Sequence, residues 1–276
     1  MTAPPAVEDR DAIKIELCKA LDSVTVARPT AVRVLTVVDD PNTTAQQVAK
    51  AIELDPTFAA QIMRLANSAY YGMSGRIGNT GFAVTVIGFA AVRSMAAISA
   101  TGLTSNRDAV PQGFWTHAAA AAAGTSVVAS RYGLVPADCF AAGLLHDIGS
   151  AFLHGFDRAA HLELMAIHGL DGAALAAAET ERFGMGHDAA AAHVLATWRF
   201  PAPFVDAVAN HHVPGSDAPL SAAVRVGDLL ALLSTGDDLP AVREELVAEG
   251  VAEDEHEGLI EITAERAGEI LASLSV

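Results

Sequence analysis

Alanine is the feature of this sequence that most constrains its fold. Runs of it, such as residues 118–123, recur in a chain of 276 residues that is 51% hydrophobic but only 5% aromatic. Alanine has the highest intrinsic helix propensity, and helices rich in it can bury a core through close contact. We therefore predict an all-α protein of two packed helical lobes, because a chain of this length is long enough for two.

Charge and cysteine content argue against several classes of function. The formal net charge is −16, from 17 basic and 33 acidic residues, which opposes binding to nucleic acid or to an anionic membrane. Cys18 and Cys139 have neither the spacing of a zinc finger nor the density of a secreted disulfide framework. The start of the chain is acidic, and no apolar run is long enough to span a bilayer. A reducing compartment, the cytoplasm, is expected.

Capping residues predict the helices of the first lobe. Thr44 with Gln47 forms a capping-box pattern that starts one helix. Asp55 and Pro56 fit the N-cap and the first position of the next helix, because proline lacks only an N–H that would be unpaired there anyway. Gly72 is placed to end that helix in a left-handed cap.

A polar segment over 104–112 is the predicted boundary between the lobes. It divides the chain into an N-terminal arm over 1–22, an N-terminal lobe over 23–105 and a C-terminal lobe with an extension over 106–276. In the C-terminal lobe, helices are expected over 114–130, 137–152, 172–181, 188–196, 203–211 and 220–234. A polar, acidic segment over 235–257 then precedes a last helix that starts near Thr263.

Histidines and aspartates of the second half are candidate metal ligands. The set consists of His117, His146, Asp147, His187, His211, His212 and Asp228. Imidazole nitrogens and carboxylate oxygens together suit Zn, Fe or Mn, and a carboxylate can bridge two ions. A mononuclear or dinuclear site is therefore a candidate.

The surroundings of these residues matter more than their number. His146 and Asp147 interrupt the apolar stretch 141–149, and His117 and Asp228 also stand in apolar helical surroundings. Burying an unpaired polar group costs about 1–3 kcal/mol, so each of these side chains needs a partner. Three separate core-like helices that present such residues indicate convergence on one point.

A reading without metal stays open beside this one. A single buried histidine is more often a hydrogen-bonded structural residue than a ligand. Asp147 could also act as a buried acceptor that orients His117 or His146 without any ion. The remaining histidines fall outside the pattern and are assigned surface or packing roles: His154, His161, His168, His193 and His256.

Motifs in both halves resemble the HDOD family, a bacterial signalling relative of the HD-superfamily phosphohydrolases. The resemblance runs from about Ser23 to Ser234. In the first half it rests on Ala27-Arg28-Pro29, Leu54-Asp55-Pro56, Leu65-Ala66-Asn67-Ser68-Ala69-Tyr70-Tyr71-Gly72 and Arg76-Ile77; in the second it rests on Phe114-Trp115-x-His117, Ala142-Gly143-Leu144-Leu145-His146-Asp147-Ile148-Gly149, His211-His212 and Gly227-Asp228-Leu229-Leu230. The resemblance implies two helical lobes, of which the C-terminal one is HD-like.

The resemblance also assigns roles. In catalytic HD hydrolases, residues that match His117, His146, Asp147 and Asp228 bind metal, and matches to His187, His211 and His212 serve dinuclear members. Such a site implies metal-activated attack of water on a phosphate ester. Ser150 stands where cyclic-dinucleotide hydrolases carry lysine, and residues 213–215 lack their Gly-Tyr-Pro motif. Cyclic di-GMP hydrolysis is therefore not expected.

Our first functional prediction is a non-catalytic signal-transduction module that binds a partner protein or a small signalling ligand, because HDOD proteins as a class have no established hydrolase activity. The alternative is a metal-dependent phosphohydrolase that acts on a nucleotide or cyclic nucleotide. A third reading is an empty site held by hydrogen bonds. No residue is assigned a catalytic role, and the cofactor is either divalent Fe, Mn or Zn or none.

Overall fold

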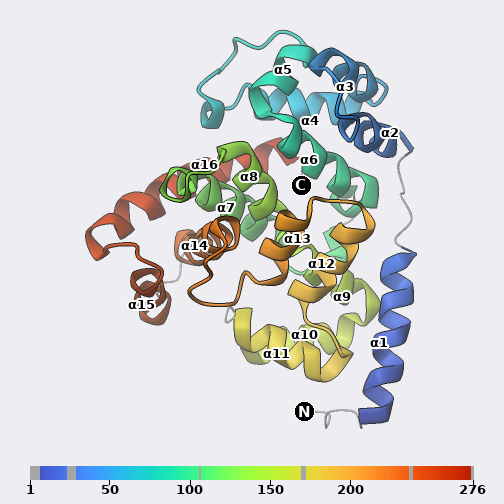
Figure 1. The fold of residues 1–276 in the computed structure, drawn as a ribbon, viewed down its shortest axis with the longest axis vertical. Coiled ribbons are helices and arrows are strands. Elements are labelled where there is room, and N and C mark those ends of the chain that lie inside the picture. Colours follow the sequence, from blue (N-terminus) through green and yellow to red (C-terminus); the bar gives the residue numbers. More distant parts are fainter. Residues whose placement is uncertain (1–6, 24–28, 106, 169–171, 236–238, 275–276) are drawn as a thin grey trace.

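A computed structural model describes residues 7–23, 29–105, 107–168, 172–235 and 239–274. The described chain is helical and contains no strand, which confirms the all-α prediction (Figure 1). Parts of four sequence predictions lie outside the described residues: residues 1–6 of the arm, Ala27-Arg28 of the family motif, Asn106 in the boundary segment and residues 236–238 of the acidic segment.

The N-terminal lobe is a group of short helices at the top of Figure 1. It contains α2 (Pro29–Val38), α3 (Ala45–Ile52), α4 (Pro56–Ala66), the 3-10 turn η1 (Ala69–Tyr71), α5 (Thr80–Ile87) and α6 (Phe89–Thr101). The predicted N-caps are confirmed: Thr44 accepts from the main-chain N of Gln47, and Asp55 accepts from those of Thr57 and Phe58. The prediction for Gly72 is wrong, because α4 ends at Ala66 and Gly72 closes η1 instead.

The C-terminal lobe follows two short turns, η2 (Leu103–Ser105) and η3 (Arg107–Ala109). Its helices are α7 (Phe114–Val127), α8 (Pro136–Leu145), α9 (Ile148–Phe156), α10 (Arg158–His168), α11 (Gly172–Phe183), α12 (His187–Thr197), α13 (Ala202–Ala209) and α14 (Pro219–Ser234), with η4 (Ala129–Tyr132) after α7. Two helices occupy the region where one was predicted over 137–152, because the helix is interrupted at His146-Asp147. Sequence analysis did not predict α10, whose first turn is capped by Asp157 through the main-chain N of Ala160.

The C-terminal extension is also more helical than predicted. It forms α15 (Pro240–Ala248), the turn η5 (Glu253–Glu255) and α16 (His256–Leu274), so α16 begins before the predicted Thr263. Helix α16 packs on α7 and α14 and reaches α4, where the carbonyl of Leu274 accepts a hydrogen bond from Gln61 at 3.0 Å. The extension therefore ties the two lobes together.

One hydrophobic cluster runs through both lobes. It includes Val34 and Ile62 from the N-terminal lobe, Leu145 and Val224 from the C-terminal lobe, and Ile270 of α16. The limits predicted for the arm and the two lobes stay a prediction. The arm region forms α1 (Val7–Asp22), which packs against α9, α11 and α12 of the C-terminal lobe (Figure 1).

Helix α7 stands at the centre of the C-terminal lobe, in contact with α8, α14 and α16. Two glycines allow the close approach: a Cβ at Gly143 would lie 2.5 Å from the carbonyl oxygen of Ala121, and one at Gly227 would lie 2.0 Å from Oγ1 of Thr125. Helices α8 and α14 can therefore press their backbones against α7. This packing brings the end of α8 and the middle of α14 close to His117 near the start of α7.

In the part of the chain described, no single helix has the length and apolar character to cross a membrane. Helices α5 and α6 meet those criteria only together, and they are bent by 107° at their junction.

Candidate metal centre

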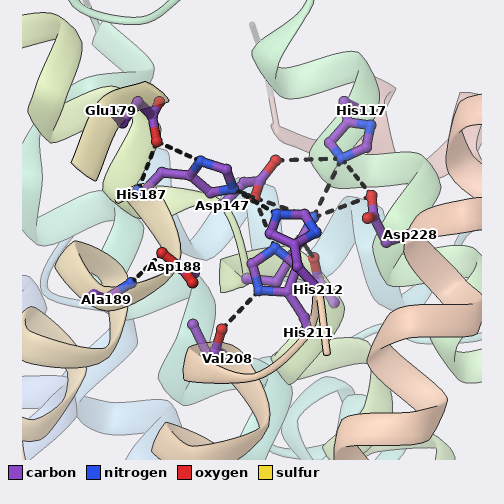
Figure 2. Close-up of polar contacts among 12 residues, drawn as sticks. His117, Asp147, Glu179, His187, Asp188, Ala189, Val208, His211, His212 and Asp228 are labelled. Atoms are coloured by element: carbon purple, nitrogen blue, oxygen red, sulfur yellow. Dashed lines mark hydrogen bonds and ion pairs between the residues drawn. The ribbon is translucent and has the colours of Figure 1, made fainter. Parts of the chain in front are cut away.

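All seven ligand candidates meet in the C-terminal lobe, and Figure 2 labels all of them except His146. They form two groups, in each of which the potential ligand atoms lie within 4.8 Å of one another. The first group is His117, His146 and Asp228, and the second is Asp147, His187, His211 and His212. The convergence predicted from three separate helices is thus present, and α12 and the end of α13 join them.

Asp147 lies between the two groups. Its Oδ1 is 3.4 Å from Nε2 of each of three imidazoles, those of His146, His187 and His211. Its Oδ2 lies 3.4 Å from Nε2 of His117, which is also 3.1 Å from Oδ1 of Asp228. Asp147 therefore belongs to the second group and also reaches His117 and His146 of the first, which is the position of a bridging ligand.

The three deepest imidazoles are held by their other ring nitrogen. Nδ1 of His146 donates to the carbonyl of Gly143 at 2.8 Å, and Nδ1 of His211 donates to that of Val208 at 2.6 Å. Nδ1 of His187 donates to a carboxylate, that of Glu179, at 2.7 Å. A proton on Nδ1 leaves the lone pair of the neutral ring on Nε2. In all three rings Nε2 then faces Oδ1 of Asp147.

Charges within the cluster shift the pKa values of its members strongly. Burial favours the neutral form of Asp147, but the charges of His146 and His187 outweigh it and hold the pKa of this carboxyl well below its usual range. Burial likewise opposes ionisation of Asp228, but hydrogen bonds from His117 and His146 keep its pKa well below the usual range. Burial would lower the pKa of His117, yet hydrogen bonds to Asp147 and Asp228 raise it to about 10.

The second group contains both extremes of imidazole basicity. Burial opposes the charge of His187, but the negative charges of Glu179 and Asp147 raise its pKa to about 9. Burial and the neighbouring rings of His211 and His187 lower the pKa of His212 to about 2. His212 is therefore neutral at physiological pH and offers a lone pair at its Nε2, which lies 2.8 Å from Nε2 of His187.

Two buried polar atoms without partners indicate whether these residues fit a cation. Oδ1 of Asp147 and Nε2 of His211 have no hydrogen-bond partner in the described chain. They face each other at 3.4 Å, and both are acceptors when Nδ1 of His211 holds its proton on Val208. Two opposed acceptors are unfavourable, and a cation between them would satisfy both. The set of imidazoles and carboxylates fits divalent Zn, Fe or Mn.

Comparison with known proteins now identifies the family. The sequence model of the HDOD domain matches residues 26–214, which is more than half of the chain. The chain belongs to the HDOD domain family. A search of the curated proteins gave no match.

Solved structures share the fold of this HDOD protein. It is similar to a protein of Shewanella amazonensis SB2B that is provisionally named a phosphohydrolase, with 23% identity and a TM-score of 0.70 over 94% of this chain and 97% of that one. It is also similar to an HDOD domain protein of unknown function from Geobacter sulfurreducens, with 21% identity and a TM-score of 0.65 over 98% of each chain. A second Shewanella amazonensis SB2B protein, provisionally named a metal-dependent phosphohydrolase, has 21% identity and a TM-score of 0.61 over 97% of this chain and 100% of that one.

A cavity of about 320 Å³ opens onto the candidate metal centre of this HDOD protein. His117, Asp147, His187, His212 and Asp228 line its polar end. The rest of the wall is mainly apolar and includes Pro111, Phe114, Met165, Leu175 and Leu232, with Ser150 close to the ligands. No lysine or arginine is among the described residues that line it.

Glu179 is the functional residue that sequence analysis missed. It lies on the alanine-rich helix α11, is fully buried, and binds both His187 and His161. Burial favours its neutral form, but the charge of His187 and the hydrogen bonds from both histidines lower its pKa to about 2. His161, assigned a surface or packing role from sequence, is a buried partner of this carboxylate. No sequence signal distinguishes Glu179 from a solvated charge, because its partners lie on other elements.

Proposed function

We propose that this HDOD protein binds two divalent metal ions and hydrolyses a phosphate ester. The observation that carries the proposal is the place of Asp147, whose Oδ1 lies 3.4 Å from the Nε2 atoms of His146, His187 and His211. Three imidazole nitrogens converge on one buried carboxylate oxygen, and Nε2 of His211 is left without a partner, a set of N and O atoms that suits a divalent cation. Two ions bound by the two groups would lower the pKa of water to near neutrality and neutralise charge on a phosphoryl group.

The chain's own residues contribute orientation and shielding. The anchored Nδ1 atoms of His146, His187 and His211 fix three rings in the tautomer that binds a cation. His117 is half-buried and faces the cavity, so its ring lies where a bound substrate would contact it. The apolar wall lowers the local dielectric, which strengthens every interaction with a charged group at the polar end.

The cavity also bears on the class of substrate. Its polar end accommodates one phosphoryl group, and its apolar wall, with Phe114 and Met165, suits an uncharged body such as a nucleoside. The described lining offers no lysine or arginine for further phosphates. A phosphate ester with a single phosphoryl group is therefore favoured over a polyphosphate or a cyclic dinucleotide.

Elemental analysis coupled to a phosphoesterase screen tests the proposal. Purified protein, as isolated and after reconstitution with Fe, Mn or Zn, is expected to hold two ions per chain and to hydrolyse at least one ester of a panel of phosphomonoesters and phosphodiesters. His146→Ala should abolish turnover, whereas His168→Ala, on α10 outside the cluster, should not. Absence of metal after reconstitution, or turnover unchanged in His146→Ala, would overturn it.

A second candidate is the non-catalytic module, in which the metal-loaded protein binds a partner protein or a small signalling ligand. One observation favours it. Ser150 lines the cavity, and it occupies the position at which cyclic-dinucleotide hydrolases carry lysine. The same experiment separates the two candidates. Two bound ions with no turnover across the whole panel would support the module and contradict the hydrolase.

A further inference from the structure

We propose that Glu179, backed by His161, is a positioning residue that prepares His187 to bind one of the two ions. The inference rests on the metal-binding half of the proposed function and assigns to these two residues a role of their own.

Glu179 is completely buried on α11. An unpaired carboxylate in such a place would be very costly, so its partners explain why it is there. Its two oxygens accept three hydrogen bonds. Oε2 accepts from the main-chain N and from Nδ1 of His187, both at 2.7 Å, and Oε1 accepts from Nε2 of His161 at 3.0 Å.

The double bond to His187 fixes both the ring and the start of its helix. His187 is the first residue of α12, and the N-cap residue Gly186 offers no side chain to cap it. Glu179 supplies that cap from another helix, and the same oxygen holds the ring. The negative charge lies at the positive end of the α12 dipole, which adds to the stabilisation.

Close packing holds His187 from the opposite side. A Cβ at Gly149 would lie 1.9 Å from the carbonyl oxygen of His187, so α9 can approach α12 only because residue 149 is glycine. With its main chain clamped and Nδ1 bound, the ring can turn only Nε2 toward Asp147 and His212, at 3.4 and 2.8 Å. Carboxylates that bind the second nitrogen of a metal-ligating histidine orient the ring and raise its basicity as a ligand.

His161 completes the arrangement from behind. It is fully buried, and its hydrogen bond occupies the oxygen of Glu179 that His187 leaves free. His154 packs edge-on against His161 with ring centroids 5.7 Å apart, but neither of its ring nitrogens has a partner in the described chain. The hydrogen-bonded chain from the metal centre therefore ends at His161, which makes His154 a suitable control.

The test is a Zn²⁺ titration of the metal-free full chain against a chromophoric chelator. The wild type is expected to bind two ions. Glu179→Gln keeps an oxygen for His187 but removes the charge, and it should weaken one ion by about 10- to 100-fold while the other, at His117, His146 and Asp228, is unchanged. His161→Gln should weaken the affinity for the same ion by a smaller factor. In the Co²⁺-substituted variants, the visible absorption bands of that ion alone should change.

Two controls separate positioning from a general effect on folding. The first is Glu181→Gln, because Glu181 lies on the same helix as Glu179 but is exposed. The second is His154→Phe, because His154 is a buried neighbour of His161 outside the hydrogen-bonded chain. Both variant proteins should bind two ions as the wild type does. A Glu179→Gln protein that loses thermal stability but titrates like the wild type would overturn the inference alone. A wild type that binds no Zn²⁺, Mn²⁺ or Fe²⁺ would overturn the proposed function instead.

Discussion

Asn67 and the candidate metal centre are both marked by specific sequence motifs, but they use polar groups in opposite ways. The amide of Asn67 donates to the carbonyls of Met63 and Ile77 and accepts from the main-chain N of Ile77, so the side chain is fully paired. In the metal centre, Oδ1 of Asp147 and Nε2 of His211 face each other without a donor. The paired amide of Asn67 stabilises the fold, whereas the unpaired acceptors of Asp147 and His211 are the basis of the proposed metal site.

Substitution of an unpaired acceptor is expected to have the largest effect, and that effect is on metal affinity. His211→Leu removes an unpaired acceptor and fills the same space with apolar atoms. We expect metal affinity in the second group to fall by at least about 1000-fold, or roughly 4 kcal/mol. The free energy of unfolding of the metal-free protein should change by less than about 1 kcal/mol, because the lost bond to Val208 is offset by relief of the opposed acceptors. Chelator competition and urea unfolding measure the two quantities, and a metal-free variant that is severely destabilised would contradict the contrast.

Asn67→Ala should show the reverse pattern. It leaves the main-chain N and O of Ile77 without their side-chain partner, which we expect to cost roughly 2–3 kcal/mol of unfolding free energy. Metal stoichiometry should stay at that of the wild type, because no ligand touches Asn67. Urea unfolding and elemental analysis on the same preparation check both halves. Loss of metal in a folded Asn67→Ala protein would show that the two regions are not independent.

The pH dependence of stability sharpens the contrast further. The pKa of His187 is raised to about 9 and that of His117 to about 10, so the stability these groups contribute is complete below about pH 6.5 and is lost as pH rises through those values. The metal-free protein should lose roughly 1–2 kcal/mol between pH 7 and 10, after allowance for partial solvent screening. Metal displaces those protons, so stabilisation by added metal should grow over the same window.

Urea unfolding at several pH values, with chelator or with Zn²⁺, measures these slopes. Asn67→Ala should give a curve parallel to the wild type, because Asn67 does not titrate. Equal slopes with and without metal would mean that the imidazoles are not the groups that exchange protons for metal.

The smallest expected effect is that of a local cap. Thr44→Ala removes the acceptor for the main-chain N of Gln47 and should cost about 1 kcal/mol, with no change in metal affinity or in the pH slope. Thermal unfolding detects it as a small fall in Tm, and Thr36→Ala, which loses only a bond to the carbonyl of Val32 within its helix, is the matched control. A change in metal affinity would contradict the assignment of this motif to the fold alone.

Sequence reasoning succeeded where the cause of a structure lies within a few residues of it. The caps at Thr44 and Asp55 depend on main-chain groups two or three positions away, and the ligand candidates stand out because apolar helices surround them. The break between α8 and α9 at His146-Asp147 was missed, because the alanine- and leucine-rich residues on both sides of it favour helix and no proline marks it. Glu179 was missed for the same reason, since all three of its bonds cross to other elements or turns.

Helix α7 carries His117 near one end and Ser126 near the other, where the hydroxyl of Tyr70 from the N-terminal lobe donates to it at 2.6 Å. Between them, residues 118–123 are all alanine and all buried against neighbouring helices. Alanine has no rotamer to change, so this stretch has no side chain that could absorb a displacement by repacking. Any displacement of α7 therefore has to be absorbed by the helices around it, and the same helix carries the candidate ligand His117 at one end and the tyrosine contact at the other.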